Sequence, residues 1–434
     1  MISTVELYSI FRKHPQISTD SRSIAKDSIF ISLKGPSFNG NLFANAALEK
    51  GAAYAVVDEI PEKPDHRLLL VEDGLTALQN LAVHHRDQLK IPFLAITGSN
   101  GKTTTKELVR NVLSRKFRTL ATRGNLNNHI GVPLTILSIT DDIEFAVIEM
   151  GANHLGEIES YCKIAKPDYG LITNIGKAHL EGFGGVEGVK KGKGELFDWL
   201  ARHGKMIFMN GDNQVLESIA AEKKLKNISR YGTNASCYLR GELIRDQPAL
   251  VVHWNCGERS GKINSQLIGA YNFENILSAV CIGNYFDVNP NAIDEAIESY
   301  QPDNSRSQVM QRGNNKIILD AYNANPSSME AALKNFDSLE SQNKIAILGE
   351  MAELGNESEP EHRRIIERLQ RSHYQRIILV GKMFADIASQ IDGIHFSDSE
   401  KAANWIQEHP FSNASILIKG SRSTRMERIL DAIN

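Results

Sequence analysis

One short stretch of the chain, residues 91–105, constrains its fold more than any other. An apolar run ends in the turn Gly98-Ser99-Asn100-Gly101-Lys102-Thr103-Thr104, and a helical pattern follows from Lys106 to Leu113. The backbone N–H groups of such a turn and the positive end of the helix behind it bind phosphate oxygens. In this pattern Lys102 is expected to reach the outer phosphates of a nucleotide, and the hydroxyl of Thr103 is expected to bind Mg²⁺. The complete Walker pattern is absent because its first glycine falls on Ile96, so an ordinary strand-to-helix turn remains the alternative.

Length and composition exclude several classes of protein. A chain of 434 residues is too long for one core and indicates two to four domains. The 49 basic and 52 acidic residues give a net charge of -3, which argues against a nucleic-acid-binding body. The four cysteines lack Cys-x-x-Cys spacing, so neither a disulfide framework nor a zinc site is indicated, and we expect a cytoplasmic protein. The N-terminus has no signal-peptide pattern and no apolar run approaches membrane-spanning length, so neither export nor membrane insertion is expected.

Strand and helix patterns alternate along most of the chain, which predicts an α/β fold. A small α/β unit precedes a helix at about residues 75–89, and a first boundary is expected near residue 87. A second boundary is expected near Gln301, beyond which strands at 316–320, 344–348, 376–380 and 415–419 again alternate with helices. The sequence therefore predicts three domains, at residues 1–86, 87–300 and 301–434, without internal repeats.

Polar residues at the ends of two buried strands are candidates for metal binding. Glu149 ends the strand that begins at Phe145, and His179 follows the strand of residues 169–175. The carboxyl ends of strands in doubly wound sheets face the ligand crevice, so both residues join Thr103 as candidate ligands of a divalent cation. A capping or ion-paired glutamate and a structural histidine are the alternatives.

Other polar clusters are candidates for substrate contact. Asn125, Asn127 and Asn128 follow the helix behind the phosphate loop, although asparagines also occur as plain turn residues. Ser21 and Arg22 lie in a basic turn that is suited to an anionic group such as a diphosphate, or is a plain surface turn. Asn272 and Asn275 share one face of a helix, where helix capping is the alternative, and Asp320 ends a strand at which a ribose or base could be held.

The ordered series of these motifs resembles the ATP-dependent Mur ligases of peptidoglycan synthesis. It is most similar to the members that add D-alanyl-D-alanine to UDP-N-acetylmuramoyl-tripeptide. The resemblance runs from Asp20-Ser21-Arg22 to Lys419-Gly420-Ser421-Arg422 and covers nearly the whole chain. Its most specific stretches are Gly98–Thr104, Thr122–Asn128, Asp320–Pro326, Leu348–Gly355 and Lys419–Arg422. One departure is Asn39, where the family usually carries Asp on the uridine side.

The resemblance implies an N-terminal domain for the UDP-sugar, a central domain with the parallel sheet of a P-loop ATPase, and a Rossmann-like C-terminal domain. The C-terminal domain would close over the nucleotide and bind the incoming dipeptide. ATP and Mg²⁺ are the implied cofactors, and the implied reaction passes through an acyl phosphate. Lys102, Lys193 and His179 would be catalytic, Asn275, Arg306, Asp320 and Asn325 would bind or border the nucleotide, and Lys193 would carry a carbamate that binds a second Mg²⁺.

The family resemblance also leads us to expect a monomer. Two other classes stay open: another amide ligase of the same superfamily, using a different amino acid or a folate, and a nucleotide-dependent binding or switch protein. The Asp-Asn-Pro-Arg motif of the diaminopimelate ligases is absent, since Asp303-Asn304-Ser305-Arg306 lies too early and lacks the proline.

Overall fold

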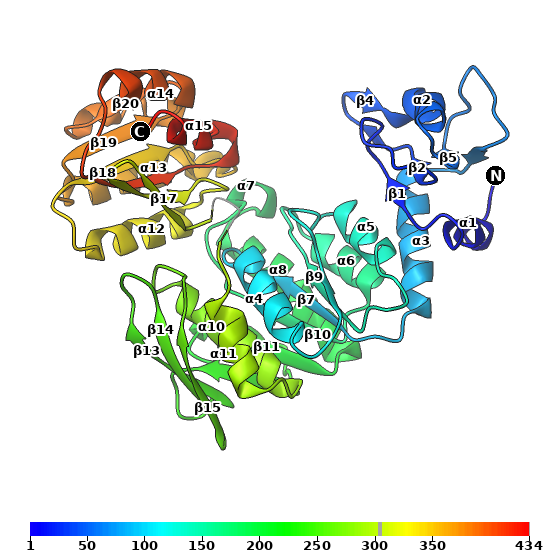
Figure 1. The fold of residues 1–434 in the computed structure, drawn as a ribbon, viewed down its shortest axis with the longest axis horizontal. Helices are drawn as coiled ribbons and strands as arrows, with labels where there is room; N and C mark the ends of the chain where they lie inside the picture. The colour runs from blue at the N-terminus through cyan, green and yellow to red at the C-terminus, as the bar shows by residue number, and fades with distance from the viewer. Residues whose placement is uncertain (303–305, 434) are drawn as a thin grey trace.

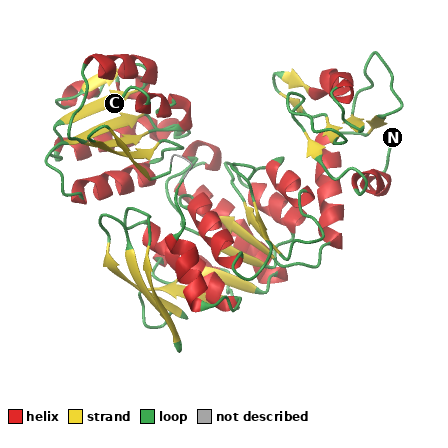
Figure 2. Ribbon diagram, in the orientation of Figure 1, coloured by secondary structure: helices red, strands yellow, loops and turns green. Residues whose placement is uncertain are grey.

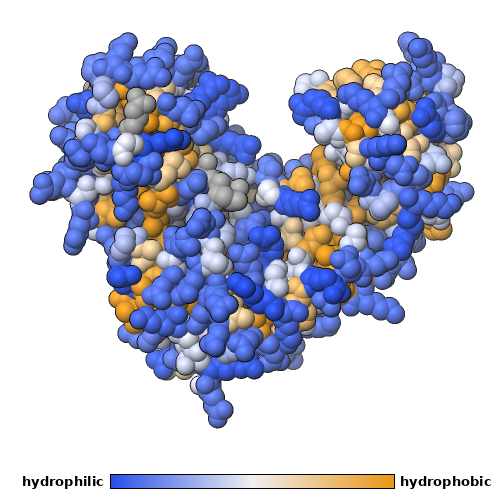
Figure 3. Space-filling view, viewed as in Figure 1, coloured by the Kyte–Doolittle hydropathy of each residue, from blue (hydrophilic) through white to orange (hydrophobic). Residues whose placement is uncertain are grey.

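The structure, a computed structural model, describes residues 1–302 and 306–433 and forms three parts (Figure 1). The N-terminal and C-terminal parts stand on opposite sides of the central part, and the space-filling view shows an open gap between them (Figure 3). In the stretch of residues 303–306, which the sequence analysis compared with the Asp-Asn-Pro-Arg motif, residues 303–305 lie outside the described residues. The α/β class expected from the sequence is observed, with strands and flanking helices in each part (Figure 2).

The N-terminal part holds a four-stranded parallel sheet of order β1-β2-β5-β6 and a short hairpin, β3-β4. Its strands are β1 Ile17–Ser18, β2 Ile29–Ile31, β3 Lys34–Gly35, β4 Phe38–Asn39, β5 Tyr54–Val57 and β6 Leu68–Leu70. Its helices are α1 Thr4–Phe11, η1 Gly40–Phe43, α2 Ala44–Glu49 and α3 Gly74–Gln88. Helix α3 continues past residue 87 and leads into the central part.

The central part is built on a nine-stranded sheet of order β15-β14-β13-β12-β11-β10-β7-β9-β8. Its strands are β7 Phe93–Thr97, β8 Thr119–Ala121, β9 Phe145–Glu149, β10 Tyr169–Ile172, β11 Met206–Asn210, β12 Ile228–Gly232, β13 Leu239–Arg245, β14 Val251–Cys256 and β15 Arg259–Asn264. Its helices are α4 Lys102–Leu113, α5 Gly131–Leu137, α6 Glu157–Ala165, α7 Leu180–Phe183, α8 Val186–His203, α9 Gln214–Glu222, α10 Asn272–Tyr285 and α11 Pro290–Glu298.

Strand β7 lies in the middle of this sheet and is buried on both faces. Phe93 and Ala95 belong to one apolar core, whereas Leu94 and Ile96 belong to the other. A parallel strand that is covered on both sides reads as a continuous apolar run, which is why the sequence predicts it. The chain leaves β7 for β8 and β9 on one side and returns to β10 on the other, so the switch point of the sheet falls at the carboxyl end of β7.

The C-terminal part has a six-stranded sheet of order β16-β17-β21-β18-β19-β20, in which β16 alone among the described strands is antiparallel to its neighbour. Its strands are β16 Gln308–Arg312, β17 Asn315–Asp320, β18 Lys344–Gly349, β19 Arg376–Val380, β20 Ile394–Phe396 and β21 Ser415–Lys419. Its helices are α12 Pro326–Ser338, η2 Gly355–Glu357, α13 Ser358–Gln370, η3 Lys382–Phe384, η4 Ala388–Gln390, α14 Ser399–Glu408, η5 Arg422–Thr424 and α15 Glu427–Leu430.

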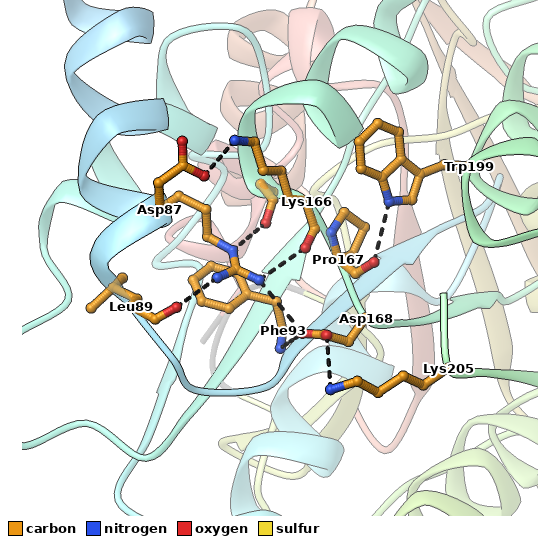
Figure 4. Close-up of polar contacts among 10 residues, drawn as sticks. Asp87, Leu89, Phe93, Lys166, Pro167, Asp168, Trp199 and Lys205 are labelled. Atoms are coloured by element: carbon orange, nitrogen blue, oxygen red, sulfur yellow. Dashed lines mark hydrogen bonds and ion pairs between the residues drawn. The ribbon is translucent and has the colours of Figure 1, made fainter. Parts of the chain in front are cut away.

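Helix α3 is fixed to the central part by a buried arginine (Figure 4). The Arg86 guanidinium donates to the backbone oxygens of Ala165 at 2.8 Å, Leu89 at 2.9 Å and Lys166 at 2.9 Å. It also lies 3.8 Å from the centre of the Phe93 ring. Ala165 ends α6, so Arg86 supplies positive charge and donors at a helix C-terminus, where backbone oxygens lack partners.

Several polar strands were not expected from the sequence. β13 and β15 extend the central sheet as an antiparallel edge, and β16 and β20 flank the C-terminal sheet. Within residues 1–302 and 306–433, none of the helices has both the length and the apolar character needed to cross a bilayer.

Candidate functional site

The phosphate loop joins β7 to α4 and depends on two glycines with positive φ. Gly98 has φ 140° and Gly101 has φ 79°. A Cβ atom at Gly98 would lie 2.0 Å from Oγ1 of Thr173, and one at Gly101 would lie 2.6 Å from Oδ1 of Asn275. Both the backbone conformation and the lack of space therefore require glycine at these positions.

Residues at the end of β10 hold the loop in shape. The Asn100 N–H donates to Oδ1 of Asn174 at 3.0 Å, and the hydroxyl of Thr173 donates to the Asn100 backbone oxygen at 2.6 Å. The Ser99 N–H donates to the Asn174 backbone oxygen at 3.0 Å. Sequence reasoning did not assign Asn174 to the site, although its place just beyond a strand end was a usable signal.

Lys102 folds back over the loop. Its Nζ donates to the backbone oxygens of Gly98 at 2.6 Å and Ser99 at 3.1 Å. Its pKa is lowered to about 8, mainly by burial; the carboxylate of Glu149 opposes this shift, and the charge of Arg306 adds to it. An anionic phosphate at the loop would stabilise the protonated form, so ligand binding and a full charge on Lys102 favour each other.

Glu149 and Thr103 meet as the sequence predicted. The Thr103 hydroxyl donates to Oε1 of Glu149 at 3.2 Å, and Nδ2 of Asn127 donates to the same oxygen at 2.7 Å. The other carboxylate oxygen, Oε2, is buried and has no hydrogen-bond partner. A buried carboxylate oxygen without a partner is costly in free energy, so its place beside the loop fits a bound cation. Asn127, predicted as a substrate contact, here orients this carboxylate.

The described part of the chain contains no group of three or more His, Cys, Asp or Glu side chains arranged to hold a metal ion. Mg²⁺ typically takes one or two protein carboxylates together with substrate phosphates. Glu149 and Thr103 are the residues that would hold it.

His179, a predicted metal ligand, contacts the C-terminal part. Its Nδ1 is hydrogen-bonded to the Glu353 carboxylate of the C-terminal part, which lowers the pKa of Glu353. His179 has φ 54° and Glu353 has φ 61°, so both residues adopt a backbone conformation that non-glycine residues seldom take. His179 lines the same cavity as Glu149, but one of its ring nitrogens already has a partner.

Lys193 is fully buried on α8. Its Nζ donates to the backbone oxygen of Ala152 at 2.8 Å and lies 5.1 Å from the centre of the Phe183 ring. Burial, with the charge of Lys102, holds its pKa well below the ordinary value. Burial therefore shifts the protonation equilibrium of Lys193 towards the neutral amine.

Two of the predicted nucleotide-binding residues contact the phosphate loop or its helix directly. Oδ1 of Asn275 accepts from the hydroxyl of Thr105 on α4 at 3.1 Å. Nδ2 of Asn325, at the start of α12, donates to Oδ1 of Asn100 at 2.8 Å. The second contact joins the C-terminal part to the phosphate loop.

The other two, Arg306 and Asp320, belong to the C-terminal side of the site. The Arg306 guanidinium lies 3.7 Å from the centre of the Tyr322 ring. Asp320 accepts from the Ser307 N–H at 3.2 Å and from Nζ of the buried Lys419 at 2.6 Å. Tyr322 and Lys419 were not among the site residues predicted from the sequence.

A cavity of about 850 Å³ lies between the central and C-terminal parts and brings most of these residues together. The predicted residues that line it are Ser99, Asn100, Gly101, Lys102, Thr104, Asn125, Asn127, Asn128, Glu149, His179, Asn275, Arg306, Asp320 and Asn325. Gly98 and Thr103 are not among its lining residues, although Ser99, Lys102 and Thr104 beside them are. Lys193 does not line it either, but Ala152, whose backbone oxygen accepts from Nζ of Lys193, does.

The predicted UDP-substrate residues fall into two places. Asn125, Asn127 and Asn128 line the cavity, and Oδ1 of Asn128 also accepts from the Gly131 N–H at the start of α5. Ser21 and Arg22 lie in the N-terminal part, outside the cavity lining, where the exposed Arg22 is paired with Asp20 at 2.8 Å.

Comparison with known proteins supports the same assignment. Residues 96–283 match the family model of the Mur ligase middle domain, and residues 305–422 match that of the Mur ligase glutamate ligase domain. The UDP-N-acetylmuramoyl-tripeptide–D-alanyl-D-alanine ligase of Bacillus subtilis (strain 168) is 32% identical over 426 residues, which cover 95% of this chain and 92% of that protein.

Two solved structures are similar over nearly the whole chain. MurF from Acinetobacter baumannii has a TM-score of 0.85 at 31% identity, covering 96% of this chain and 92% of that one. MurF ligase from Thermotoga maritima, solved in complex with ADP, has a TM-score of 0.82 at 25% identity, covering 96% of both chains. This chain therefore belongs to the Mur ligase family, within the branch of the UDP-N-acetylmuramoyl-tripeptide–D-alanyl-D-alanine ligases.

Proposed function

We propose that this chain is an ATP-dependent ligase that joins D-alanyl-D-alanine to UDP-N-acetylmuramoyl-tripeptide in peptidoglycan precursor synthesis. The observation that carries the proposal is the position of the phosphate loop. The loop, the unpartnered oxygen of Glu149 and the C-terminal residues Arg306 and Asn325 all meet at one cavity between two parts of the chain. A ligase that condenses two substrates with ATP needs such a shared site.

The reaction has two steps. A carboxylate oxygen of the tripeptide forms a bond to the γ-phosphorus of ATP as the bond to the β-phosphate oxygen breaks, which releases ADP and leaves an acyl phosphate. The amine of D-alanyl-D-alanine, after losing a proton, then forms a bond to the carbonyl carbon, and the carbon–oxygen bond to phosphate breaks. Peptide, ADP and phosphate are the products.

The chain's residues act mainly on charge and position. The loop N–H groups and Lys102 hold the phosphates, and Lys102 neutralises the charge that develops on the transferred group. Mg²⁺ bound by Thr103 and Glu149 would neutralise part of the triphosphate charge while a second anion approaches. Asn127 keeps the Glu149 carboxylate oriented, with its Nδ2 2.7 Å from Oε1.

Lys193 is proposed to carry a carbamate, as the family resemblance implies. A neutral lysine adds CO₂ at Nζ and releases a proton, and the low pKa of this buried side chain favours the neutral form. The carbamate would turn a cation into an anionic oxygen ligand for a second Mg²⁺.

The carbamate is tested by ¹³C NMR of the protein equilibrated with ¹³C-bicarbonate. A carbamate resonance is expected in the native protein and absent in Lys193→Ala, whose activity small carboxylates such as acetate should partly restore. Rescue by a small amine alone, with no carbamate resonance, would refute the modification and leave the ligase function standing.

We propose domain boundaries at residues 86/87 and 300/301, with a separate binding role for each domain. The N-terminal part, with Ser21 and Arg22, would hold the UDP-sugar end, while the tripeptide would extend towards Asn125 in the central cavity. The C-terminal part would contribute nucleotide contacts and the site for the dipeptide. We further propose that the protein acts as a monomer in the cytoplasm.

An ADP-release assay tests the function. We expect ADP release only when ATP, UDP-N-acetylmuramoyl-tripeptide and D-alanyl-D-alanine are all present. Release with a single amino acid in place of the dipeptide would indicate another ligase of the superfamily. If no combination of these substrates stimulates release, the nucleotide-dependent binding protein would be the better description.

A further inference from the structure

Arg422 is a cavity-lining cation that the proposed reaction has not used. Four Lys or Arg side chains line the cavity among the described residues: Lys102, Arg306, Lys419 and Arg422. Arg422 begins η5, directly beyond β21, and its side chain is exposed. Among the described residues, no carboxylate lies within ion-pair distance of its guanidinium. The guanidinium lies 5.3 Å from the centre of the Tyr322 ring.

The other three cationic side chains already have partners in the structure. Lys419 is paired with Asp320 at 2.6 Å, and Lys102 lies on the carbonyls of the phosphate loop. Arg306 packs more closely on Tyr322, with its guanidinium 3.7 Å from the centre of the ring. Arg422 is left as the cation of the C-terminal side that can take an anion from a substrate.

The dipeptide brings such an anion. Its amine must reach the acyl phosphate formed at the loop, while its own carboxylate lies about 7 Å away along an extended two-residue chain. The carboxylate therefore falls on the wall of the cavity away from the reacting carbon. A guanidinium is well suited to bind it, because two parallel N–H groups match two carboxylate oxygens.

We propose that Arg422 binds the terminal carboxylate of the incoming D-alanyl-D-alanine and so determines that the acceptor is a free acid; this inference rests on the proposed ligase function. The Tyr322 ring, whose centre lies 5.3 Å from the Arg422 guanidinium, is within the range of a cation–π contact. Ser423, which lines the cavity beside Arg422, offers a further hydroxyl on the same side.

A neighbouring hollow supplies the matched control. It measures about 200 Å³, shares Ser423 with the main cavity and is lined by another arginine, Arg425. Arg425 is exposed and follows Arg422 by three residues, yet it does not line the main cavity. A charge effect that is merely local would appear equally in Arg422→Gln and Arg425→Gln.

The test compares D-alanyl-D-alanine with D-alanyl-D-alaninamide, which lacks the carboxylate, as acceptors in the ADP-release assay. Wild type and Arg425→Gln should prefer the acid by about 10- to 100-fold in kcat/KM, as expected for a charge-assisted hydrogen bond. Arg422→Gln should lose the acid selectively, so that the preference falls to within about 3-fold, and Arg422→Lys should lie between. KM for ATP and for the UDP-tripeptide should stay within about 2-fold, which also shows that the variant is folded.

Three results would overturn the inference: no preference for the acid in wild type, an unchanged preference in Arg422→Gln, or loss of the preference in Arg425→Gln instead. A rise in KM for the UDP-tripeptide in Arg422→Gln, with the acid preference kept, would assign the arginine to a carboxylate of that substrate and would equally overturn it. Failure of wild type to release ADP with the dipeptide would refute the proposed function itself. The two failures are therefore distinguishable.

Discussion

Replacement of Arg86 by methionine should weaken the attachment of α3 to the central part. Methionine retains an unbranched apolar chain but removes the guanidinium of a residue that is only 9% exposed. The backbone oxygens of Ala165, Leu89 and Lys166 would each lose a donor at 2.8–2.9 Å. The stacking on Phe93 would be lost as well.

The size of the effect follows from these contacts. A hydrogen bond from a charged donor contributes about 1.5–3 kcal/mol, and a cation over an aromatic ring contributes about 0.5–2 kcal/mol. These contributions do not add fully, because the contacts share one guanidinium. Burial also lowers the pKa of Arg86, so the cost of desolvating the charged form offsets part of the stabilisation. We therefore expect a loss of about 3 kcal/mol in the free energy of unfolding of the central part, in the range for a broken buried charge network.

Urea unfolding followed by tryptophan fluorescence measures this loss. Trp199 donates to the Pro167 backbone oxygen at 3.2 Å beside the arginine, so a variant with Trp254 and Trp405 changed to phenylalanine reports locally (Figure 4). Arg12→Met in the same background is the matched control. Arg12 also joins the N-terminal and central parts, through Asp141 at 3.0 Å, but both side chains are exposed.

An exposed ion pair contributes little to stability, so Arg12→Met should leave the transition almost unchanged. Equal effects of Arg86→Met and Arg12→Met would refute the reasoning, because they would show that burial and the contacts with the helix ends add nothing. A shift in Arg86→Met below about 1 kcal/mol would refute it too, since one charged hydrogen bond alone accounts for more.

Three further predictions follow from the site. Lys102→Ala should lower ADP release by at least about 100-fold at an unchanged melting temperature, as for loss of a group that stabilises transition-state charge, and near-normal turnover would contradict the phosphate-loop assignment. Small-angle scattering should show a smaller radius of gyration with a non-hydrolysable ATP analogue and UDP-substrate, because nucleotide contacts come from both sides of the cavity. Burial lowers the pKa of His362, whose Nε2 accepts from the Met351 N–H at 2.9 Å, so the unfolded state binds more protons below pH about 6.5. Stability should fall as the pH falls through that range, and less steeply in His362→Gln; identical slopes would contradict it.

The elements that sequence reasoning predicted best are the strands buried on both faces. β7, β9 and β10 are buried along their whole lengths. In a sequence such strands are recognised as apolar runs bounded by glycine or polar residues. Their ends also locate the site, because carboxyl ends of parallel strands meet at one edge of the sheet. Glu149 and the phosphate loop were placed together for this reason.

Two of the strands that sequence reasoning missed, β15 and β16, are polar and lie at sheet edges. β15 and β16 alternate exposed with partly buried residues and contain few apolar side chains. Their pairing depends on the neighbouring strand, since backbone hydrogen bonds form whatever the side chains are. A pattern based on apolar side chains carries little information about such strands.

Side-chain contacts between the central and C-terminal parts could not be predicted from the sequence either. His179 with Glu353 and Asn325 with Asn100 join residues 174 and 225 positions apart. Each residue alone fitted a local explanation, as a metal ligand, a cap or a border of the nucleotide site. The partner is fixed only by how the C-terminal part packs on the central part, and no local pattern specifies that packing.

The segment that follows β10 contacts both the phosphate loop and the C-terminal part. Asn174 fixes the phosphate loop through the Asn100 N–H, and three residues later the Lys177 N–H donates to the hydroxyl of Ser327 on α12 at 3.0 Å. We therefore predict that a shift of the loop on nucleotide binding would reach the C-terminal part through the few residues between Asn174 and Lys177. Conversely, movement of that part changes the support of the loop through Asn325 and Asn100. One contact uses the segment after β10 and the other uses Asn100 of the loop, and Asn174 joins the two. We therefore predict that nucleotide binding and placement of the C-terminal part are coupled, and by thermodynamic reciprocity each then changes the free energy of the other by the same amount.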